Sequence, residues 1–218
     1  MNAQDSIFEL IRTSNVALVR EWVAENPAIA SDRDPNGISA VLYARYRSNT
    51  EILEILLAAN PPLDLFDAAA VGRRDVVLEV LRTDPDAVVA WSPDGFTALH
   101  LAAYFGHPDT VDLLIAHGAE VRAVARNPML LTALHSAVAA RQAGIVATLL
   151  EHGADPNAIQ AGGWTALHAA ASHGDLQMVE LLLAHGADRF LKGDDGRDAT
   201  AMAGEKNHAA VVERLHVH

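Results

Sequence analysis

A segment of about 33 residues recurs along this chain, and a repeat of that length predicts a row of small stacked units instead of one central core. The clearest copies are DGFTALHLAAYFGHPDTVDLLIAHGA at 94–119 and GWTALHAAASHGDLQMVELLLAHGA at 163–187, and a weaker copy lies at 131–154. Seven copies align on one position, which is held by Phe8, Leu42, Phe66, His100, His135, His168 and Ala201. We therefore predict a single domain with approximate units at 1–33, 34–60, 61–90, 91–125, 126–158, 159–191 and 192–218.

Within each unit the pattern predicts two helices joined by a tight turn. The first apolar run follows a residue whose side-chain oxygen can accept a backbone N–H, namely Ser39, Thr97, Thr132, Thr165 or Asp198. Six positions after the aligned residue come Gly72, Gly106, Gly174 and Asn207, which tolerate the left-handed conformation that ends a helix. Ser14, Ser48 and Arg141 hold the same position, so we expect those turns to be strained or different.

Two segments carry a closer resemblance to a known family. TALHLAAYFGH at 97–107 and TALHAAASHGD at 165–175, each followed by an HGA stop, resemble the ankyrin repeat. The resemblance extends over essentially the whole chain and is most specific in units four to six. It implies an all-α solenoid of stacked helix-turn-helix units, with finger loops projecting from one edge and no enzymatic activity. The mixture of proline-terminated and HGA-terminated units is similar to ankyrin proteins of bacteria.

The repeat is irregular at two joints. Units two and three are separated by a step of 24 residues where the other steps are 33 to 35, so Asn60–Asp64 is expected to join them without a finger. Between units four and five, the connection 119–131 is two residues longer than its equivalent at 154–164. Simple sequence drift accounts for both irregular joints, and the alternative is a shaped notch beside an apolar finger that serves function.

Composition narrows the range of partners and of chemistry. The formal net charge is −12, with 16 Lys and Arg against 28 Asp and Glu, which disfavours nucleic acid and anionic membrane surfaces. The absence of cysteine excludes disulfides, thiolate nucleophiles and Cys-based zinc sites. Neither a signal peptide nor an apolar run of about 18 residues is visible, so we predict a soluble cytoplasmic protein.

Eleven histidines raise the question of a metal site or a catalytic centre. His100, His135 and His168 hold one position in successive units, and the resemblance implies that this histidine bonds the backbone of a neighbouring loop. His117, His152 and His185 precede the final glycine of a unit, where a cation favours the helix terminus. Equivalent groups would lie about 10 Å apart, too far to share one metal with bonds of about 2 Å. No catalytic motif is visible, so we expect no enzyme, no cofactor and no metal site.

The positions of aromatic residues point to a binding surface. The resemblance implies that certain finger residues, and the two residues before the inter-helix turn, face a concave groove, namely Tyr46, Arg47, Trp91, Asp94, Phe96, Tyr104, Phe105, Met129, Leu131, Trp164 and His173. Aromatic anchors with polar surroundings are typical of protein-binding hot spots. We therefore predict a monomer that binds a partner protein with Lys or Arg at its rim.

Other interpretations remain open at this point. The aromatics could be scattered surface residues that adjacent fingers partly cover. The notch near Trp91 could bind a small ligand, and the histidine-rich face could serve an enzyme. Within the class of protein-binding modules, the sequence does not distinguish an inhibitor or assembly chaperone of a specific enzyme from a general scaffold. The groove could also support self-association.

Overall fold

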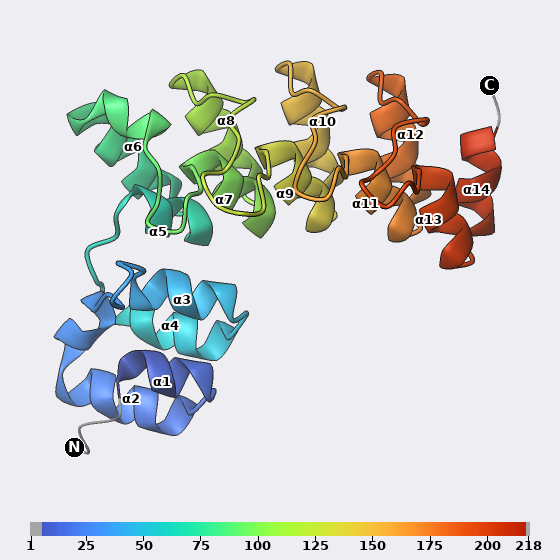
Figure 1. The fold of residues 1–218 in the computed structure, drawn as a ribbon. Coiled ribbons are helices and arrows are strands. Elements are labelled where there is room, and N and C mark those ends of the chain that lie inside the picture. The colour runs from blue at the N-terminus through green and yellow to red at the C-terminus, as the bar shows by residue number, and fades with distance from the viewer. Residues whose placement is uncertain (1–5, 217–218) are drawn as a thin grey trace.

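The computed structural model describes residues 6–216, and these form an all-helical solenoid, as the repeat predicts (Figure 1). Residues 1–5 and 217–218, the outer ends of the first and last predicted units, lie outside the described residues. The helices form consecutive pairs: α1 Ile7–Arg12 and α2 Val16–Glu25, α3 Ala40–Tyr46 and α4 Thr50–Ala58, α5 Leu65–Val71 and α6 Arg74–Thr83, α7 Ala98–Phe105 and α8 Pro108–Ala116, α9 Ala133–Ala139 and α10 Ala143–Glu151, α11 Ala166–Ser172 and α12 Leu176–Ala184, α13 Ala199–Glu205 and α14 Ala209–His216. Two 3₁₀ turns, η1 Pro27–Ser31 and η2 Pro85–Val89, follow α2 and α6. The unit boundaries themselves stay a prediction.

The first helix of each pair begins where the sequence predicts. Ser39, Thr97, Thr132, Thr165 and Asp198 are all N-cap residues. In α7 the cap is reciprocal, because the Thr97 hydroxyl accepts from the His100 backbone while the Thr97 N–H donates to His100 Nδ1 at 3.3 Å. Two donors that would otherwise be left unpaired at the helix start are satisfied in this way.

The turn between the two helices of a pair is left-handed in every unit. The φ angles of Gly72, Gly106, Gly174 and Asn207 are 72°, 79°, 67° and 62°, as expected for residues that tolerate this conformation. Ser14, Ser48 and Arg141 adopt the same conformation, with φ of 54°, 53° and 57°. Since a β-carbon makes the left-handed region unfavourable by about 1–2 kcal/mol, these three turns are strained.

Replacing Ser48 with glycine should therefore stabilise the protein. We expect the free energy of unfolding of Ser48→Gly to rise by about 1 kcal/mol, because glycine adopts the observed φ of 53° without the steric penalty. Urea titration followed by circular dichroism measures the change. Thr50→Gly, at the exposed start of α4, is the matched control and should destabilise slightly. A loss of stability in Ser48→Gly would contradict strain at this turn.

The stack is continuous along the first helices of the pairs and interrupted along the second. Helices α3, α5, α7, α9, α11 and α13 pack in sequence, and small residues such as Ala69 and Ala102 let their backbones approach closely. The second helices also pack in order, but the packing lapses between α4 and α6. Two hydrophobic clusters result, one in α1–α4 and one centred on α5–α14. We call residues 6–58 the arm and residues 65–216 the body.

The short joint predicted at Asn60–Asp64 produces a bend between the arm and the body (Figure 1). Asn60 takes a left-handed φ of 52°, and the chain then runs without helix to Asp64, the N-cap of α5. No finger forms here, as the sequence suggested. The finger of unit two consequently lies beside that of unit four, where a β-carbon on Gly37 would be 3.3 Å from Pro93.

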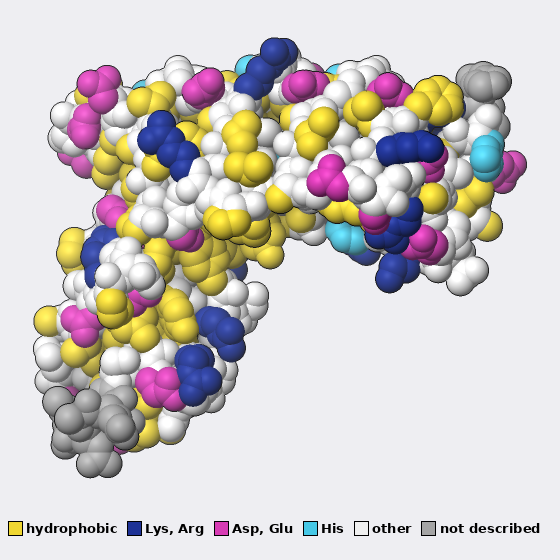
Figure 2. All heavy atoms as spheres, viewed as in Figure 1, with side chains coloured by type: hydrophobic (Ala, Val, Ile, Leu, Met, Phe, Trp, Pro, Cys, Tyr) yellow, Lys and Arg dark blue, Asp and Glu magenta, His cyan; other side chains and the backbone are white. Residues whose placement is uncertain are grey.

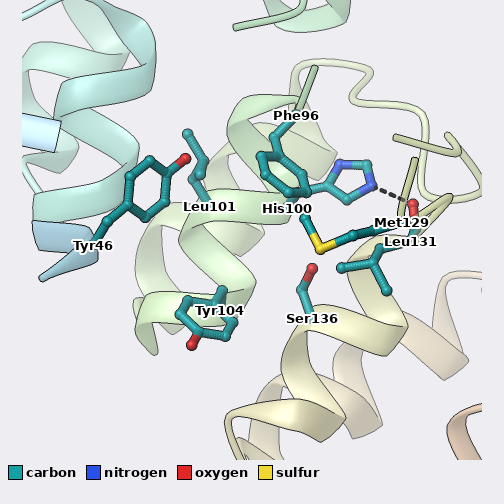
Figure 3. Close-up of a pocket in the computed structure, with 8 residues that line it drawn as sticks. All are labelled: Tyr46, Phe96, His100, Leu101, Tyr104, Met129, Leu131 and Ser136. Carbon is teal, nitrogen blue, oxygen red and sulfur yellow. Dashed lines mark hydrogen bonds between the residues drawn. The ribbon is translucent and has the colours of Figure 1, made fainter. Parts of the chain in front are cut away.

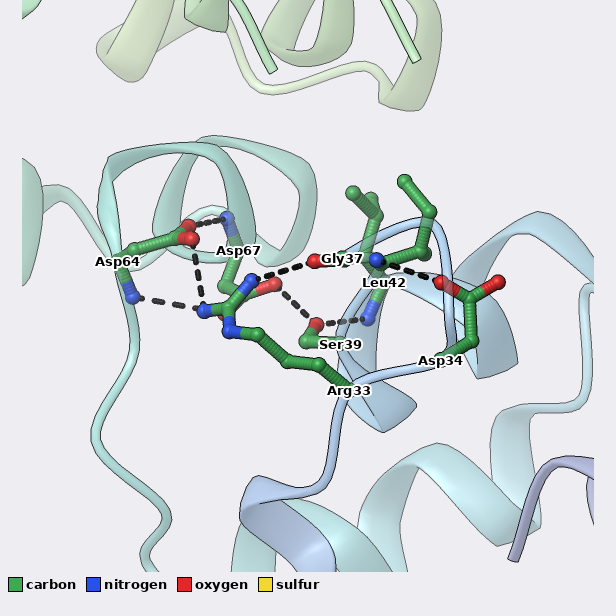
Figure 4. A network of polar contacts seen from close by, with 8 residues as sticks. Arg33, Asp34, Gly37, Ser39, Leu42, Asp64 and Asp67 are labelled. Carbon is green, nitrogen blue, oxygen red and sulfur yellow. Dashed lines mark hydrogen bonds and ion pairs between the residues drawn. The ribbon is translucent and has the colours of Figure 1, made fainter. Parts of the chain in front are cut away.

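A polar network fastens the arm to the start of α5 (Figure 4). Arg33 donates to Asp64 Oδ2 at 2.9 Å and lies 3.7 Å from Asp67, while the buried Ser39 hydroxyl donates to Asp67. Burial, with the Asp64 charge adding to it, raises the pKa of Asp67 above its usual range. The bend is thus set by specific contacts as well as by the shortened chain.

Candidate partner-binding site

A recess opens on the inner side of the bend, where the arm meets the middle of the body (Figure 3). Its volume is about 230 Å³, and its lining residues come from α3, from α7 and α9, and from the two fingers between them: Tyr46, Phe96, His100, Leu101, Tyr104, Met129, Leu131 and Ser136. Figure 2 shows hydrophobic side chains gathered in this inner corner. Tyr104 and Met129 are each 48% exposed, so both side chains are available for contact beside the recess.

Five of the eleven predicted site residues line this recess: Tyr46, Phe96, Tyr104, Met129 and Leu131. Sequence reasoning missed His100, Leu101 and Ser136. The repeat pattern gave His100 only a structural role. Leu101 and Ser136 directly follow the aligned histidine of their units, at a position that the neighbouring units of a regular stack bury. For His100 and Leu101, the available signal was their helical spacing to Tyr104, one turn further on in α7. Ser136 lies on α9, and no such signal pointed to it.

Tyr46 reaches the recess across an intervening unit. In units three and four its position is held by Ala70 and Tyr104, and the small Ala70 leaves room for Tyr46 to extend over it. Its hydroxyl donates to Asp94 Oδ2 at 2.5 Å, and Ser92 donates to the other oxygen, also at 2.5 Å. Burial, together with the Asp94 carboxylate, raises the pKa of the Tyr46 phenol.

The resemblance implies that Phe105 and Trp164 face the groove, but both side chains pack against neighbouring segments. The Arg45 guanidinium lies 4.4 Å from the Phe105 ring centroid, and the Tyr46 ring lies 5.9 Å from it. Trp164 covers the next finger so closely that a β-carbon on Gly193 would be 2.5 Å from its ring. Both side chains therefore hold neighbouring segments together.

The remaining predicted residues lie outside the recess lining. Trp91 is half-buried, with the Arg126 guanidinium 4.5 Å from its ring. Arg47 is exposed at the end of α3, and His173 follows α11 on the C-terminal side. The structure does not bring His173, Trp164 and Trp91 together with the recess.

The fingers are joined to one another by backbone hydrogen bonds. Arg126 N–H donates to the Gly95 carbonyl at 2.8 Å, and Ala161 N–H donates to the Met129 carbonyl at 3.1 Å. The Asn127 amide also donates to the Asp94 carbonyl at 3.0 Å. The longer connection between units four and five therefore holds Met129 and Leu131 in place on the finger edge, where they form the far wall of the recess.

The repeated histidines serve the fold. His100 Nε2 donates to the Leu131 carbonyl at 3.0 Å, since its Nδ1 accepts from Thr97. His135 and His168 direct the same nitrogen toward the backbone of the next finger, without a hydrogen bond of ordinary geometry. His117, His152 and His185 each bond the carbonyl four residues earlier through Nδ1, at 2.8, 2.8 and 2.9 Å. Within residues 6–216, no group of side chains is arranged to hold a metal ion.

The helices of residues 6–216 are all too short, or too polar, to cross a membrane.

Comparison with known proteins agrees with the repeat and the fold. Residues 65–160 match the family described as ankyrin repeats (3 copies), and residues 149–203 match ankyrin repeats (many copies). The two matches together extend over well over half of the sequence, so the chain belongs to the ankyrin repeat family. Residues 1–64, which include the arm, lie outside both matches.

Curated relatives share the repeat over part of their length. A BTB/POZ domain and ankyrin repeat-containing protein of Oryza sativa subsp. japonica is 36% identical over 111 residues, 47% of this chain and 22% of that protein. Ankyrin repeat domain-containing protein 49 of Bos taurus is 39% identical over 74 residues, 34% of this chain and 31% of that protein. Alpha-latrocrustotoxin-Lt1a of Latrodectus tredecimguttatus is 31% identical over 116 residues, 49% of this chain and 8% of that protein. The chain thus matches less than a third of each of these relatives.

Ankyrin repeats generally mediate protein–protein interaction, and proteins built from them are typically non-enzymatic.

Proposed function

We propose that this protein binds a partner protein on the concave side of the bend and that the recess between Tyr46 and Met129 is the centre of the interface. The observation that carries the proposal is the exposure of Tyr104 and Met129 around an apolar recess, in a stack that buries most of its other large apolar side chains. Large apolar anchors around a pocket supply most of the binding energy in protein interfaces. A rigid stack also limits the entropy lost on binding.

The double variant Tyr104→Ala with Met129→Ala is expected to weaken partner binding roughly 30-fold or more, because it removes the two most exposed walls of the recess. The partner is first captured from lysate of the source organism, and its affinity is then measured by titration calorimetry. Phe105 is left unchanged because it packs against Arg45 and Tyr46.

The matched control is Val89→Ala with Val124→Ala, two exposed side chains outside the recess, which should bind as wild type does. Wild-type affinity in the Tyr104/Met129 variant, at unchanged melting temperature, would move the interface elsewhere.

Other details of the function stay predictions. We propose a monomer in the cytoplasm that binds neither nucleic acid nor membrane, on the basis of the acidic composition and the absence of cysteine. The partner can equally be an enzyme that this chain inhibits or helps to assemble. The alternative, small-ligand binding in the notch near Trp91, is less favoured because the Arg126 guanidinium lies over that ring.

A further inference from the structure

The recess has a carboxylate at its edge that forms no ion pair with any Lys, Arg or His among residues 6–216. Asp94 is half-buried and lies next to the recess wall, since the Tyr46 hydroxyl is 2.5 Å from its Oδ2. None of the ion pairs in the described part of the chain includes Asp94. The negative charge is therefore available to a partner.

The two hydroxyls that hold Asp94 also orient it. Tyr46 donates to one carboxylate oxygen and Ser92 to the other, so the group is fixed before any partner arrives. The Asp94 carbonyl in turn accepts from Asn127 of the next finger. Each carboxylate oxygen keeps a lone pair, and a cation can bind without disturbing either hydroxyl.

The recess itself suits one large apolar group. A volume of about 230 Å³ is of the size of a single bulky side chain, and the walls are mostly apolar, with hydroxyls only from Tyr46, Tyr104 and Ser136. On its N-terminal side the recess is bounded by Tyr46 of α3, and the finger of the arm lies against Pro93. We therefore place the bound segment over the recess and toward α9.

From these observations we infer a two-part site for a polypeptide segment of the partner. One Leu, Phe or Trp side chain fills the recess, and a Lys or Arg close to it in the segment pairs with Asp94. The apolar part supplies affinity, and the charge pair fixes the register of the segment. This inference rests on the proposed function and adds the chemistry of the partner.

Selection from a library of random peptides displayed on phage, using the full chain as bait, tests the inference. We expect selected peptides to share one large apolar residue with a Lys or Arg nearby. A synthetic peptide of this type should bind the Tyr104→Ala/Met129→Ala variant roughly 30-fold more weakly. Asp94→Asn should weaken the same peptide about three- to fivefold, and the Lys→Gln form of the peptide should not distinguish Asp94→Asn from wild type.

Two further variants keep the result interpretable. Tyr46→Phe removes one hydroxyl but keeps the Asp94 charge, so it should retain the preference for the basic peptide. Asp112→Asn, an exposed carboxylate on α8, is the matched charge control and should bind as wild type does.

The unfavourable outcomes are distinct from one another. Peptides that need Tyr104 and Met129 but bind Asp94→Asn normally would overturn the charge pair and leave the proposed function standing. A selection that enriches no peptide would overturn the inference, while the captured partner would still test the proposed function by itself.

Binding of small apolar dyes in place of peptides would contradict the inference and assign the recess to small ligands. Selected peptides that bind Tyr104→Ala/Met129→Ala and Asp94→Asn as tightly as wild type would contradict the inference and the proposed function together.

Discussion

Lowering the pH from 7 to 4 is expected to reduce the free energy of unfolding by about 6 kcal/mol through His100 and His135 alone. Burial lowers the pKa of each of these imidazoles from 6.5 to about 4, and both side chains are less than 5% exposed. A pKa displaced by one unit corresponds to about 1.4 kcal/mol, so each histidine contributes about 3 kcal/mol over this range.

The sign follows from the direction of the displacement. In the unfolded chain these histidines protonate near pH 6.5, whereas in the folded chain they stay neutral until about pH 4. Their contribution to stability is complete above pH 6.5 and is lost progressively as the pH falls from 6.5 to about 4. Asp67 acts in the opposite sense. Because its pKa is raised in the folded chain, its charged form is less favourable at neutral pH, and its protonation stabilises the fold as the pH falls.

Urea denaturation at pH 7 and pH 4 measures the change, and the double variant His100→Gln with His135→Gln provides the comparison. Glutamine at this third helical position can accept the capping bond of Thr97 or Thr132 but does not titrate. The variant should therefore lose about 6 kcal/mol less than wild type between the two pH values. An equal loss in both proteins would show that these histidines are not responsible for the sensitivity to acid.

The second large effect concerns Gly95, in the finger that carries Asp94 and Phe96. We expect Gly95→Ala to reduce the free energy of unfolding by about 3 kcal/mol or more. Gly95 has a φ of 83°, which by itself makes alanine unfavourable by about 1–2 kcal/mol. A β-carbon would also lie 2.6 Å from the Arg126 carbonyl oxygen, and relieving such crowding adds about 1–3 kcal/mol.

Gly118→Ala separates the two causes. Its φ is 90°, yet nothing lies within 4 Å of the added β-carbon, so only the backbone strain of about 1–2 kcal/mol should appear. Thermal unfolding of both variants gives the comparison. Equal losses of stability in the two variants would mean that the finger containing Arg126 moves away from the added β-carbon with no measurable loss of stability.

Local features of the fold were predictable because neighbouring residues determine them. The N-cap residues from Ser39 to Asp198 begin helices since their side chains reach only the next turn of the chain. The left-handed turns at Gly72 and Gly106 follow from the preference of one residue type. The strain at Ser48 was visible in the same way, as a departure from the repeated pattern.

Only part of the candidate site could be predicted from the sequence. The repeat suggested Tyr104 and Met129 as exposed groove residues, and both line the recess. It also suggested Trp164 and Phe105, but contacts with Gly193 and Arg45 lie in segments that a single repeat does not contain. The pattern within one repeat does not show which of its side chains pack against residues of a neighbouring repeat in the folded protein.

The sequence by itself determined that this protein is a stack of helix pairs, because caps, turns and apolar spacing all act over a few residues. It also located the missing finger at Asn60–Asp64 by counting alone. Only the tertiary structure decided what the missing finger does: with the finger of the arm against Pro93, Tyr46 extends past Ala70 to Asp94 and closes one end of the recess. That arrangement depends on contacts between residues 48 positions apart, whose partners are set by the direction of the bend and not by any local preference.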